Sequence, residues 1–238
     1  MSGKHGMRLH RFLIGDTLSE GPLTLTDTDL VHQIRSVLRL TVGSSLILMD
    51  GKGSEAEALI ERVEKDRIEV HAGDVRAITT EPARSVTLFC SILRRENFEW
   101  VVQKATEVGA TKIVPVIGER TVKTGLRMDR LTRIAREAVE QCGRGVVPVI
   151  EEPVDFVAAL ALAPAKNVFF HLGATGEDWG TSLKGAGDAG VWIGPEGGWT
   201  DAEAEKAEKK GFTVASLGSL ALRAETAAVV GTYLAIHA

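Results

Sequence analysis

The chain has 238 residues, of which 44% are hydrophobic and 25% are charged, and its formal net charge is −4 at pH 7. This composition is typical of a folded globular protein rather than of a disordered chain or a membrane protein. The negative net charge argues against nucleic-acid binding through overall charge, although a local basic patch could still attract a polyanion. No apolar run is long enough to cross a bilayer, and residues 1–9 lack the apolar core of a signal peptide, so a cytoplasmic location is expected.

The first third of the chain is predicted to be rich in β-strands, with one helix. Short apolar or alternating runs predict strands at residues 9–14, 45–50, 56–63 and 67–72. Apolar residues recur at helical spacing over residues 27–40, and Asp27 or a neighbouring threonine can cap that helix. A small β-barrel with one helix fits this pattern. We predict a first domain over residues 1–77, followed by a linker at residues 78–83.

Strands and helices alternate after the linker. Apolar runs predict strands at residues 85–93, 112–117, 167–172, 191–193 and 213–217. Helical periodicity and end signals predict helices at residues 97–108, 128–142, 200–211 and 223–236. This order predicts an α/β domain over residues 78–238, with a mainly parallel sheet covered on both faces. Ligands bind at the carboxyl ends of such strands, here the loops after Leu172, Ile193 and Leu217.

Two glycine clusters could hold a ligand, and the predicted elements on either side of each cluster distinguish them. Residues 185–190 match the dinucleotide pattern G-x-G-x-x-G, but a strand follows where a helix should, which favours a surface loop over a dehydrogenase site. Residues 194–198 follow a strand directly and precede a capped helix at Thr200. Glycines there let the backbone approach a ligand, and Pro195 stiffens the turn. A tight strand–helix connection would have the same composition, so the loop alone decides nothing.

The last predicted helix begins with polar residues and is otherwise apolar. Arg223, Glu225 and Thr226 stand at its start. A helix this apolar is normally buried, and charges that are buried or half-buried need partners. The charges either pair with one another or are positioned beside a ligand.

The two cysteines indicate neither a metal site nor a disulfide framework, because Cys90 and Cys142 are single thiols far apart in the chain. Cys90 lies in an apolar run and is predicted to be a buried, inert thiol. Cys142 lies in a turn and could be near a site, but no base is placed beside either residue to activate it.

Separated motifs follow one another in a characteristic order along nearly the whole chain. They are residues 32–39 with Val42 and Gly43, residues 98–115, residues 137–144 with Pro148, the Gly-Pro-Glu-Gly-Gly loop at 194–198, and residues 217–218 and 222–227. In this order they resemble the ribosomal RNA small subunit methyltransferase E family, which belongs to the knotted SPOUT methyltransferases. Leu220 and Ala221 depart from the family pattern, which has an arginine and a β-branched residue there.

The resemblance implies a fold, a cofactor and a reaction. The fold would be an α/β, trefoil-knotted parallel-sheet domain at the C-terminus with a small PUA-like β-barrel at the N-terminus. The reaction would be S-adenosylmethionine-dependent methylation of N3 of a uridine in 16S rRNA, by resemblance uridine 1498 in the decoding region of the small ribosomal subunit. The implied cofactor-binding residues are His171, Leu172, Gly173, Ile193, Gly194, Pro195, Glu196, Gly198, Leu217, Gly218, Ala221 and Leu222. They fall on the three loops that the strand-end rule selects, although His171 could also be purely structural.

Catalysis and RNA binding are assigned on the same basis. Arg223 would favour the anionic base electrostatically, and Glu225 would act as base or hold Arg223, with Glu196 as the alternative carboxylate. Basic residues recur at spacings of three and four on the N-terminal helix and are suited to phosphates. The expected RNA-binding residues are Arg8, Arg11, His32, Arg35 and Arg39 in the first domain, and Lys104 and Arg144 in the second.

Further expectations concern assembly and alternatives. Knotted methyltransferases are typically homodimers whose partner residues complete the site, so a dimer is expected, with no metal and no membrane partner. An enzyme of the same fold could instead modify another RNA or a ribose hydroxyl. A non-catalytic RNA-binding or ribosome-assembly protein could also keep this fold, and cofactor binding would distinguish it.

Overall fold

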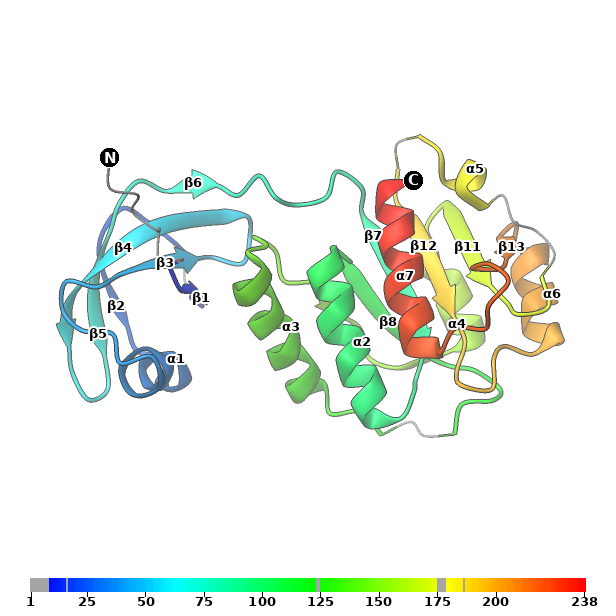
Figure 1. The fold of residues 1–238 in the computed structure, drawn as a ribbon, viewed down its shortest axis with the longest axis horizontal. Coiled ribbons are helices and arrows are strands. Elements are labelled where there is room, and N and C mark those ends of the chain that lie inside the picture. Colours follow the sequence, from blue (N-terminus) through cyan, green and yellow to red (C-terminus); the bar gives the residue numbers. More distant parts are fainter. Residues whose placement is uncertain (1–8, 16, 123–124, 175–178, 186) are drawn as a thin grey trace. The chain divides into compact units, whose positions relative to one another are not determined.

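The computed structural model describes residues 9–15, 17–122, 125–174, 179–185 and 187–238 (Figure 1). Contacts divide the chain into two units, Met1–Glu81 with Val139–Val146, and Pro82–Ala138 with Val147–Ala238. The division at Glu81 and Pro82 falls inside the predicted linker. The sequence did not predict that residues 139–146 belong to the first unit.

The first unit is a mixed sheet with a short helical segment. Its strand order is β1-β3-β4-β5-β2, with β6 paired to β4, and the β1–β3 pair is parallel while the other pairs are antiparallel. The elements are β1 (Arg11–Leu13), β2 (Gly21–Leu25), α1 (Thr28–His32), η1 (Gln33–Val37), β3 (Ser45–Met49), β4 (Ser54–Val63), β5 (Ile68–Ala72) and β6 (Arg76–Ala77).

Alternation along the strands builds the core of the first unit. In β4, Ala56, Ala58 and Ile60 are buried, while Glu57 and Leu59 between them are exposed. Successive side chains of a strand point to opposite faces, so one face of this sheet packs inward. The inward side chains pack with those of the helical segment, including the fully buried Ile34.

The helix predicted over residues 27–40 is wrong in its geometry and its end. Asp27 caps it as expected, because its Oδ1 accepts a hydrogen bond from the Leu30 N–H at 2.9 Å. From Gln33 the segment is a π-helix, in which the Leu38 N–H donates to the Gln33 carbonyl at 2.9 Å. Arg39 then takes a left-handed conformation with φ 53°, beyond the helix. His32, Arg35 and Arg39 therefore do not form the single α-helical stripe that their spacing predicted, because the wider turn changes the periodicity.

The second unit is a parallel sheet with helices on both faces. Its strand order is β10-β8-β7-β12-β11-β13, with β9 paired to β8, and every one of these pairs is parallel. The elements are β7 (Val86–Ser91), α2 (Arg95–Val108), β8 (Lys112–Ile117), α3 (Met128–Cys142), β9 (Val149–Ile150), β10 (Val154–Asp155), α4 (Phe156–Ala161), β11 (Lys166–Phe170), α5 (Trp179–Leu183), β12 (Ala189–Ile193), α6 (Asp201–Lys209), β13 (Thr213–Ala215) and α7 (Ala224–His237).

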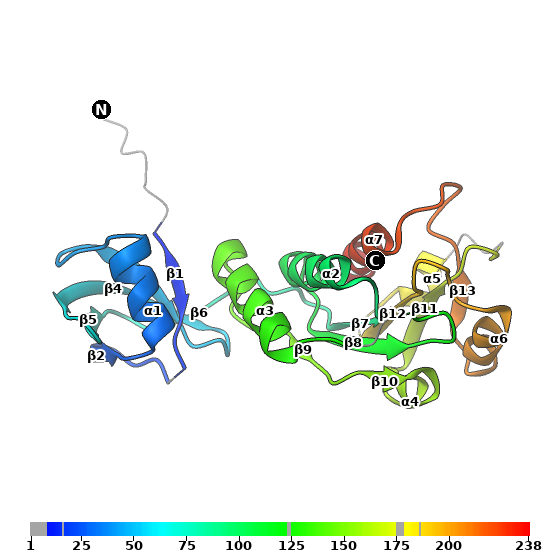
Figure 2. The same ribbon diagram turned by 90° about the horizontal axis from the view of Figure 1, so that it is seen from below.

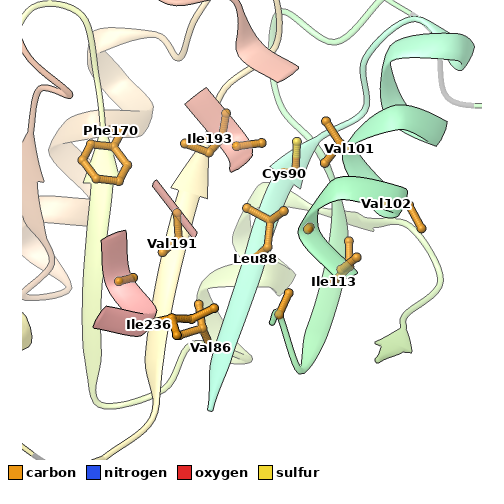
Figure 3. Close-up of a cluster of buried hydrophobic side chains, with 14 of the residues drawn as sticks. Val86, Leu88, Cys90, Val101, Val102, Ile113, Phe170, Val191, Ile193 and Ile236 are labelled. Atoms are coloured by element: carbon orange, nitrogen blue, oxygen red, sulfur yellow. The ribbon is translucent and has the colours of Figure 1, made fainter. Parts of the chain in front are cut away.

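Two hydrophobic clusters lie on opposite faces of this sheet. Leu88 and Cys90 of β7 point to the face covered by α2 and α7, as Figure 3 shows for Leu88, Cys90 and their neighbours. Phe89, between them, points to the other face and stacks on Trp192 of β12 with ring centroids 4.0 Å apart. Figure 2 shows α2 and α7 side by side on one face and α4 on the other. The predicted two-sided burial of a parallel sheet is thus confirmed.

End signals in the sequence fix the bounds of two helices. Helix α2 ends at Gly109, whose φ of 111° favours glycine at a helix end. Helix α6 begins with a capping box in which the Thr200 side chain accepts from the Glu203 N–H and the Glu203 carboxylate accepts from the Thr200 N–H. Both ends were predicted from the sequence.

Candidate active site

A cavity of about 660 Å³ lies at the carboxyl ends of three neighbouring strands in the second unit. The register aligns those ends, because Phe170 of β11 pairs with both Ile193 of β12 and Ala215 of β13. The loops that follow the three strands therefore converge. The lining residues are Arg94, Asn97, Arg120, Phe170, His171, Leu172, Ile193, Gly194, Pro195, Glu196, Gly197, Gly198, Trp199, Ser216, Leu217, Leu220, Ala221, Leu222, Arg223, Ala224, Glu225 and Ala227.

Most residues of the predicted pocket line this cavity. From the first two loops it gathers His171, Leu172, Ile193, Gly194, Pro195, Glu196 and Gly198. From the third loop and the start of α7 it gathers Leu217, Ala221, Leu222, Arg223 and Glu225. Gly173 and Gly218 do not line it. Gly173 instead borders a shallower hollow with Asp201, and Gly218 has a φ of 114°, which suits a turn residue.

The glycine loop after β12 can hold its shape only with glycine at its first position. A Cβ on Gly194 would lie 2.8 Å from the Trp199 backbone nitrogen, so any side chain would force the backbone apart. The Gly198 N–H donates to the Pro195 carbonyl at 2.8 Å and closes the turn. The backbone of residues 194–198 therefore forms a wall of the cavity with little side-chain bulk over it.

Two arginines hold this loop from neighbouring strand ends. The Arg120 Nη1 donates to the Gly197 carbonyl at 2.7 Å and to the Trp199 carbonyl at 3.3 Å. The Glu196 Oε1 accepts a hydrogen bond from the Arg94 backbone N–H at 3.1 Å. One oxygen of Glu196 is thereby engaged by the backbone, which weakens its case as a catalytic base.

Arg223 and Glu225 present unpaired charges to the cavity. Among the described residues, neither side chain has an ion pair or hydrogen bond, and Arg223 precedes α7 without capping it. The alternative that these charges simply pair with one another is therefore not what the structure shows. Burial raises the pKa of the Cys90 thiol well above its usual value, and the negative charges of Glu196 and Glu225 raise it further. Cys90 is thus the buried, inert thiol that the sequence predicted.

The apolar wall includes two aromatic side chains that were not among the predicted site residues. Phe170 and Trp199 contribute aromatic surface to the cavity. Leu172 and Leu220 are 71% and 77% exposed at its rim, high values for leucine. The His171 Nε2 lies 3.5 Å from the Asp201 Oδ1, so His171 has a structural contact as well as a place on the wall.

The sequence did not predict Arg94, Asn97 and Arg120 as site residues. They follow β7 and β8, whereas the ligand was expected at the loops after three other strands. The strand register, however, indicates that these residues lie near the site. Cys90 of β7 pairs with Ile193 of β12, so the carboxyl end of β7 lies beside the glycine loop. The strand-end rule, applied to every neighbour of β12, selects Arg94 and Asn97 as well.

The residues expected to contact RNA come from both units, and within the first unit Arg35 and Arg39 line one hollow. In the first unit, the Arg35 Nη1 donates to the Lys65 carbonyl at 2.9 Å, and the Arg11 Nε lies 3.6 Å from the Glu55 carboxylate. Exposed His32 and Arg39 flank the π-helix on either side. In the second unit, the Lys104 Nζ pairs with Glu107 at 2.8 Å. Arg8 lies outside the described residues.

Arg144 requires a correction. It is only 4% exposed, and its guanidinium donates to the Glu81 carboxylate, with Nη2 at 2.8 Å. Glu81 also accepts from the Gly145 and Val146 N–H groups. A buried, paired guanidinium is not available to a phosphate, so the structure gives Arg144 a packing role.

Among the described residues there is no group of three or more metal-ligating side chains, and no helix is long and apolar enough to span a membrane.

Family models match both parts of the chain. Residues 80–235 match an RNA methyltransferase domain, and residues 25–72 match an RNA methyltransferase PUA domain. With the parallel sheet and its strand-end cavity, these matches define the class: the chain is an RNA methyltransferase.

Individual relatives narrow the class to a family. Ribosomal RNA small subunit methyltransferase E of Rickettsia conorii is 30% identical over 230 residues, which cover 94% of this chain and 93% of the relative. The family's enzyme from Neisseria gonorrhoeae, bound to S-adenosyl methionine, has a TM-score of 0.87 at 30% identity and covers 94% of this chain and 95% of its own. A Legionella pneumophila structure in complex with the same bound cofactor has a TM-score of 0.88 at 30% identity, covering 97% of both chains. The chain belongs to the ribosomal RNA small subunit methyltransferase E family.

Proposed function

We propose that this protein transfers a methyl group from S-adenosylmethionine to N3 of a uridine in 16S rRNA, with uridine 1498 of the small ribosomal subunit as the target. The observation that carries the proposal is the convergence of three strand-end loops on one cavity that also presents the unpaired Arg223 and Glu225. Related structures with bound S-adenosylmethionine support the choice of cofactor.

The cavity fits the cofactor by size and chemistry. Its volume lies within the range of roughly 300–1,000 Å³ that is usual for small-molecule sites. Apolar side chains of Leu172, Leu217 and Leu222 would pack on the adenosine, and the bare backbone at Gly194 would allow hydrogen bonds at close range. When bound, the cofactor supplies an electrophilic methyl group on a sulfonium centre.

Residues at the start of α7 would prepare the nucleophile. The N3–H of a uracil ring is a weak nucleophile until its proton leaves. Glu225 would accept that proton, and the Arg223 guanidinium would stabilise the negative charge that remains on the ring. The N3 lone pair would then form the new N–C bond to the methyl group as the S–C bond of the sulfonium breaks, with that electron pair returning to sulfur, which leaves as the neutral thioether S-adenosylhomocysteine. Both side chains are free for these roles, whereas Glu196 is tied to Arg94.

The first unit would bind the RNA outside the cavity. Its match to an RNA methyltransferase PUA domain supports this role. Arg11, His32, Arg35 and Arg39, with Arg8, would contact phosphates, and Lys104 would add a contact in the second unit. We further propose that the sheet of the first unit closes into a barrel, that the C-terminal chain is trefoil-knotted, and that residues 1–77 and 78–238 act as the two domains, in the cytoplasm.

A homodimer would complete the enzyme. Tyr233 and Leu234 of α7 are 51% and 37% exposed, and Trp100 of the adjacent α2 is 41% exposed. Large apolar side chains that are exposed on two adjacent helices are typical of an interface between subunits. We propose that this surface, Trp100 with Tyr233 and Leu234, packs against a second copy.

Methyl transfer tests the proposal directly. Purified protein is incubated with S-adenosylmethionine labelled in its methyl group and with small ribosomal subunits from a strain lacking the activity. Label should enter 16S rRNA at one equivalent per subunit. Cofactor binding by calorimetry without any label transfer to RNA would contradict the proposed reaction.

A further inference from the structure

The arginines of the second unit differ in whether they have a partner. Most pair with a carboxylate or donate to backbone carbonyls. The arginines with such partners are Arg84, Arg95, Arg120, Arg127, Arg130 and Arg133, and Arg136 also has an interaction. Within the described part of this unit, Arg94 and Arg223 are the arginines whose side chains have neither an ion pair nor a hydrogen bond, and both line the cavity.

Arg94 is fixed at its backbone and free at its side chain. Its N–H donates to the Glu196 Oε1 at 3.1 Å, and its carbonyl accepts from the Phe98 N–H at 3.0 Å in the first turn of α2. The preceding Leu93 is only 1% exposed, which anchors the chain on the sheet. The side chain of Arg94 is exposed. The backbone of Arg94 is thus anchored beside the cavity, and its guanidinium is free to meet a ligand at the rim.

The charged side chains that line the cavity favour an anionic ligand. The arginines that line the cavity are Arg94, Arg120 and Arg223, and the carboxylates are Glu196 and Glu225. Three arginines against two carboxylates give this wall a net charge of +1, and the charged side chains without a partner among the described residues are those of Arg94, Arg223 and Glu225. S-Adenosylmethionine carries one carboxylate against a sulfonium and an ammonium, so it does not supply the missing negative charge. A nucleic-acid backbone does, and the fork of an arginine matches a phosphate.

We propose that Arg94 binds a backbone phosphate of the RNA segment next to the target nucleotide. This inference rests on the proposed function, because it takes RNA as the substrate of the cavity. Arg223 acts at the base, whereas Arg94 holds the strand in register at the rim. Phosphate contacts of this kind position a nucleic acid without reading its sequence.

The neighbouring residue Arg95 provides a matched control. It is exposed and lies one position away, but it pairs with Glu99 at 3.1 Å and does not line the cavity. Arg94→Ala, Arg94→Lys and Arg95→Ala are compared for methyl transfer to small ribosomal subunits, for binding of those subunits at several salt concentrations, and for S-adenosylmethionine affinity by calorimetry.

We expect Arg94→Ala to raise the KM for subunits about tenfold, the loss expected for one charge-assisted hydrogen bond. The slope of log affinity against log salt should fall by about 1, because one phosphate contact is lost. Arg94→Lys should restore part of the affinity, since it keeps the charge. The kcat, the cofactor affinity and every property of Arg95→Ala should stay within about twofold of the wild type, a change of under 0.5 kcal/mol.

Equal KM and salt slope in Arg94→Ala and Arg95→Ala would overturn the inference. So would a loss of cofactor affinity with subunit binding unchanged, which would place Arg94 in the cofactor site. Wild-type protein that transfers no methyl group, with a reduced salt slope in Arg94→Ala, would defeat the proposed function while supporting the phosphate contact.

Discussion

At the scale of single residues, the site depends on charges that lack partners. Most other arginines of the second unit pair with a carboxylate or donate to backbone carbonyls, whereas Arg223 and Glu225 face the cavity unpaired within the described residues. Arg223 is exposed and Glu225 is half-buried, so both charges are within reach of a ligand in the cavity. The proposed roles of these two residues can be tested separately.

We expect Arg223→Ala and Glu225→Gln each to lower kcat by a factor of about 10² to 10³, the usual effect of removing an electrostatic stabiliser or a general base. Cofactor affinity should change by less than about twofold, because neither side chain is needed for apolar packing on the adenosine. Single-turnover methyl transfer gives the rate, and calorimetry gives the affinity. Near-normal rates in both variants with normal cofactor binding would show that the assignment is wrong.

A second prediction concerns the buried ion pair of the first unit. Glu81→Ala leaves the Arg144 guanidinium buried without its carboxylate, which typically costs about 3 to 5 kcal/mol of unfolding free energy. Glu137→Ala removes a mostly exposed pair with Arg133 and should cost less than about 1 kcal/mol. Urea titrations of the two variants measure the difference. Equal unfolding free energies in the two variants would show that the buried Glu81–Arg144 pair contributes no more to stability than the exposed pair.

At the scale of elements, the glycine loop links three strand ends. Residues 194–198 are bound from β7 through Arg94 and from β8 through Arg120. This wall of the cavity is therefore held at two points, and if it binds the cofactor as proposed, substitutions that move it should affect binding before they affect chemistry.

Gly194→Ala tests this rigidity. A Cβ placed 2.8 Å from the Trp199 backbone nitrogen must displace the loop, so we expect S-adenosylmethionine affinity to fall at least about tenfold, as when the site's geometry shifts by a fraction of an ångström. Gly180→Ala places its Cβ in open space and serves as the control. Calorimetry on both variants provides the measurement, and unchanged affinity in Gly194→Ala would rule out close backbone contact at this position.

The helices and strands also show how much of the structure the sequence predicts. The long periodic elements, such as α2, β8 and α3, were predicted within a few residues, because many residues repeat one pattern. Short elements were missed, among them β2, β6, β9, β10, α4 and α5. Several of these strands have only two residues, so their pairing partners decide their conformation and no local period can reveal them.

The residues of the candidate site differ in the same way: some have a local signal in the sequence, and others depend on distant partners. The loops after β11, β12 and β13 were predicted because glycines and polar residues stand at strand ends. Arg94 and Arg120 were missed because their contacts with the glycine loop span 102 and 77 residues of sequence. Arg144 was predicted as an RNA contact because its partner, Glu81, lies 63 residues away. Such residues come together only in the folded chain.

At the scale of the whole molecule, we expect a dimer through α7. Tyr233→Asp places a charge on the proposed interface and should weaken dimerisation by about 2 kcal/mol or more, the effect of removing an aromatic interface residue. Val157→Asp, at a 63% exposed position on α4, should have no such effect. Sedimentation equilibrium at micromolar concentrations measures both, and a monomeric wild type would contradict the proposed assembly.

The central claim is tested most directly by locating the methyl group. Small ribosomal subunits from a strain lacking the activity are incubated with the protein and S-adenosylmethionine, and the 16S rRNA is then examined by primer extension and mass spectrometry. Methylation at N3 blocks Watson–Crick pairing, so we expect a new stop at uridine 1498 and an N3-methyluridine there, both absent with Arg223→Ala. Methylation of another nucleotide or of a ribose hydroxyl, or an unmodified uridine 1498 after full cofactor binding, would contradict the proposed reaction.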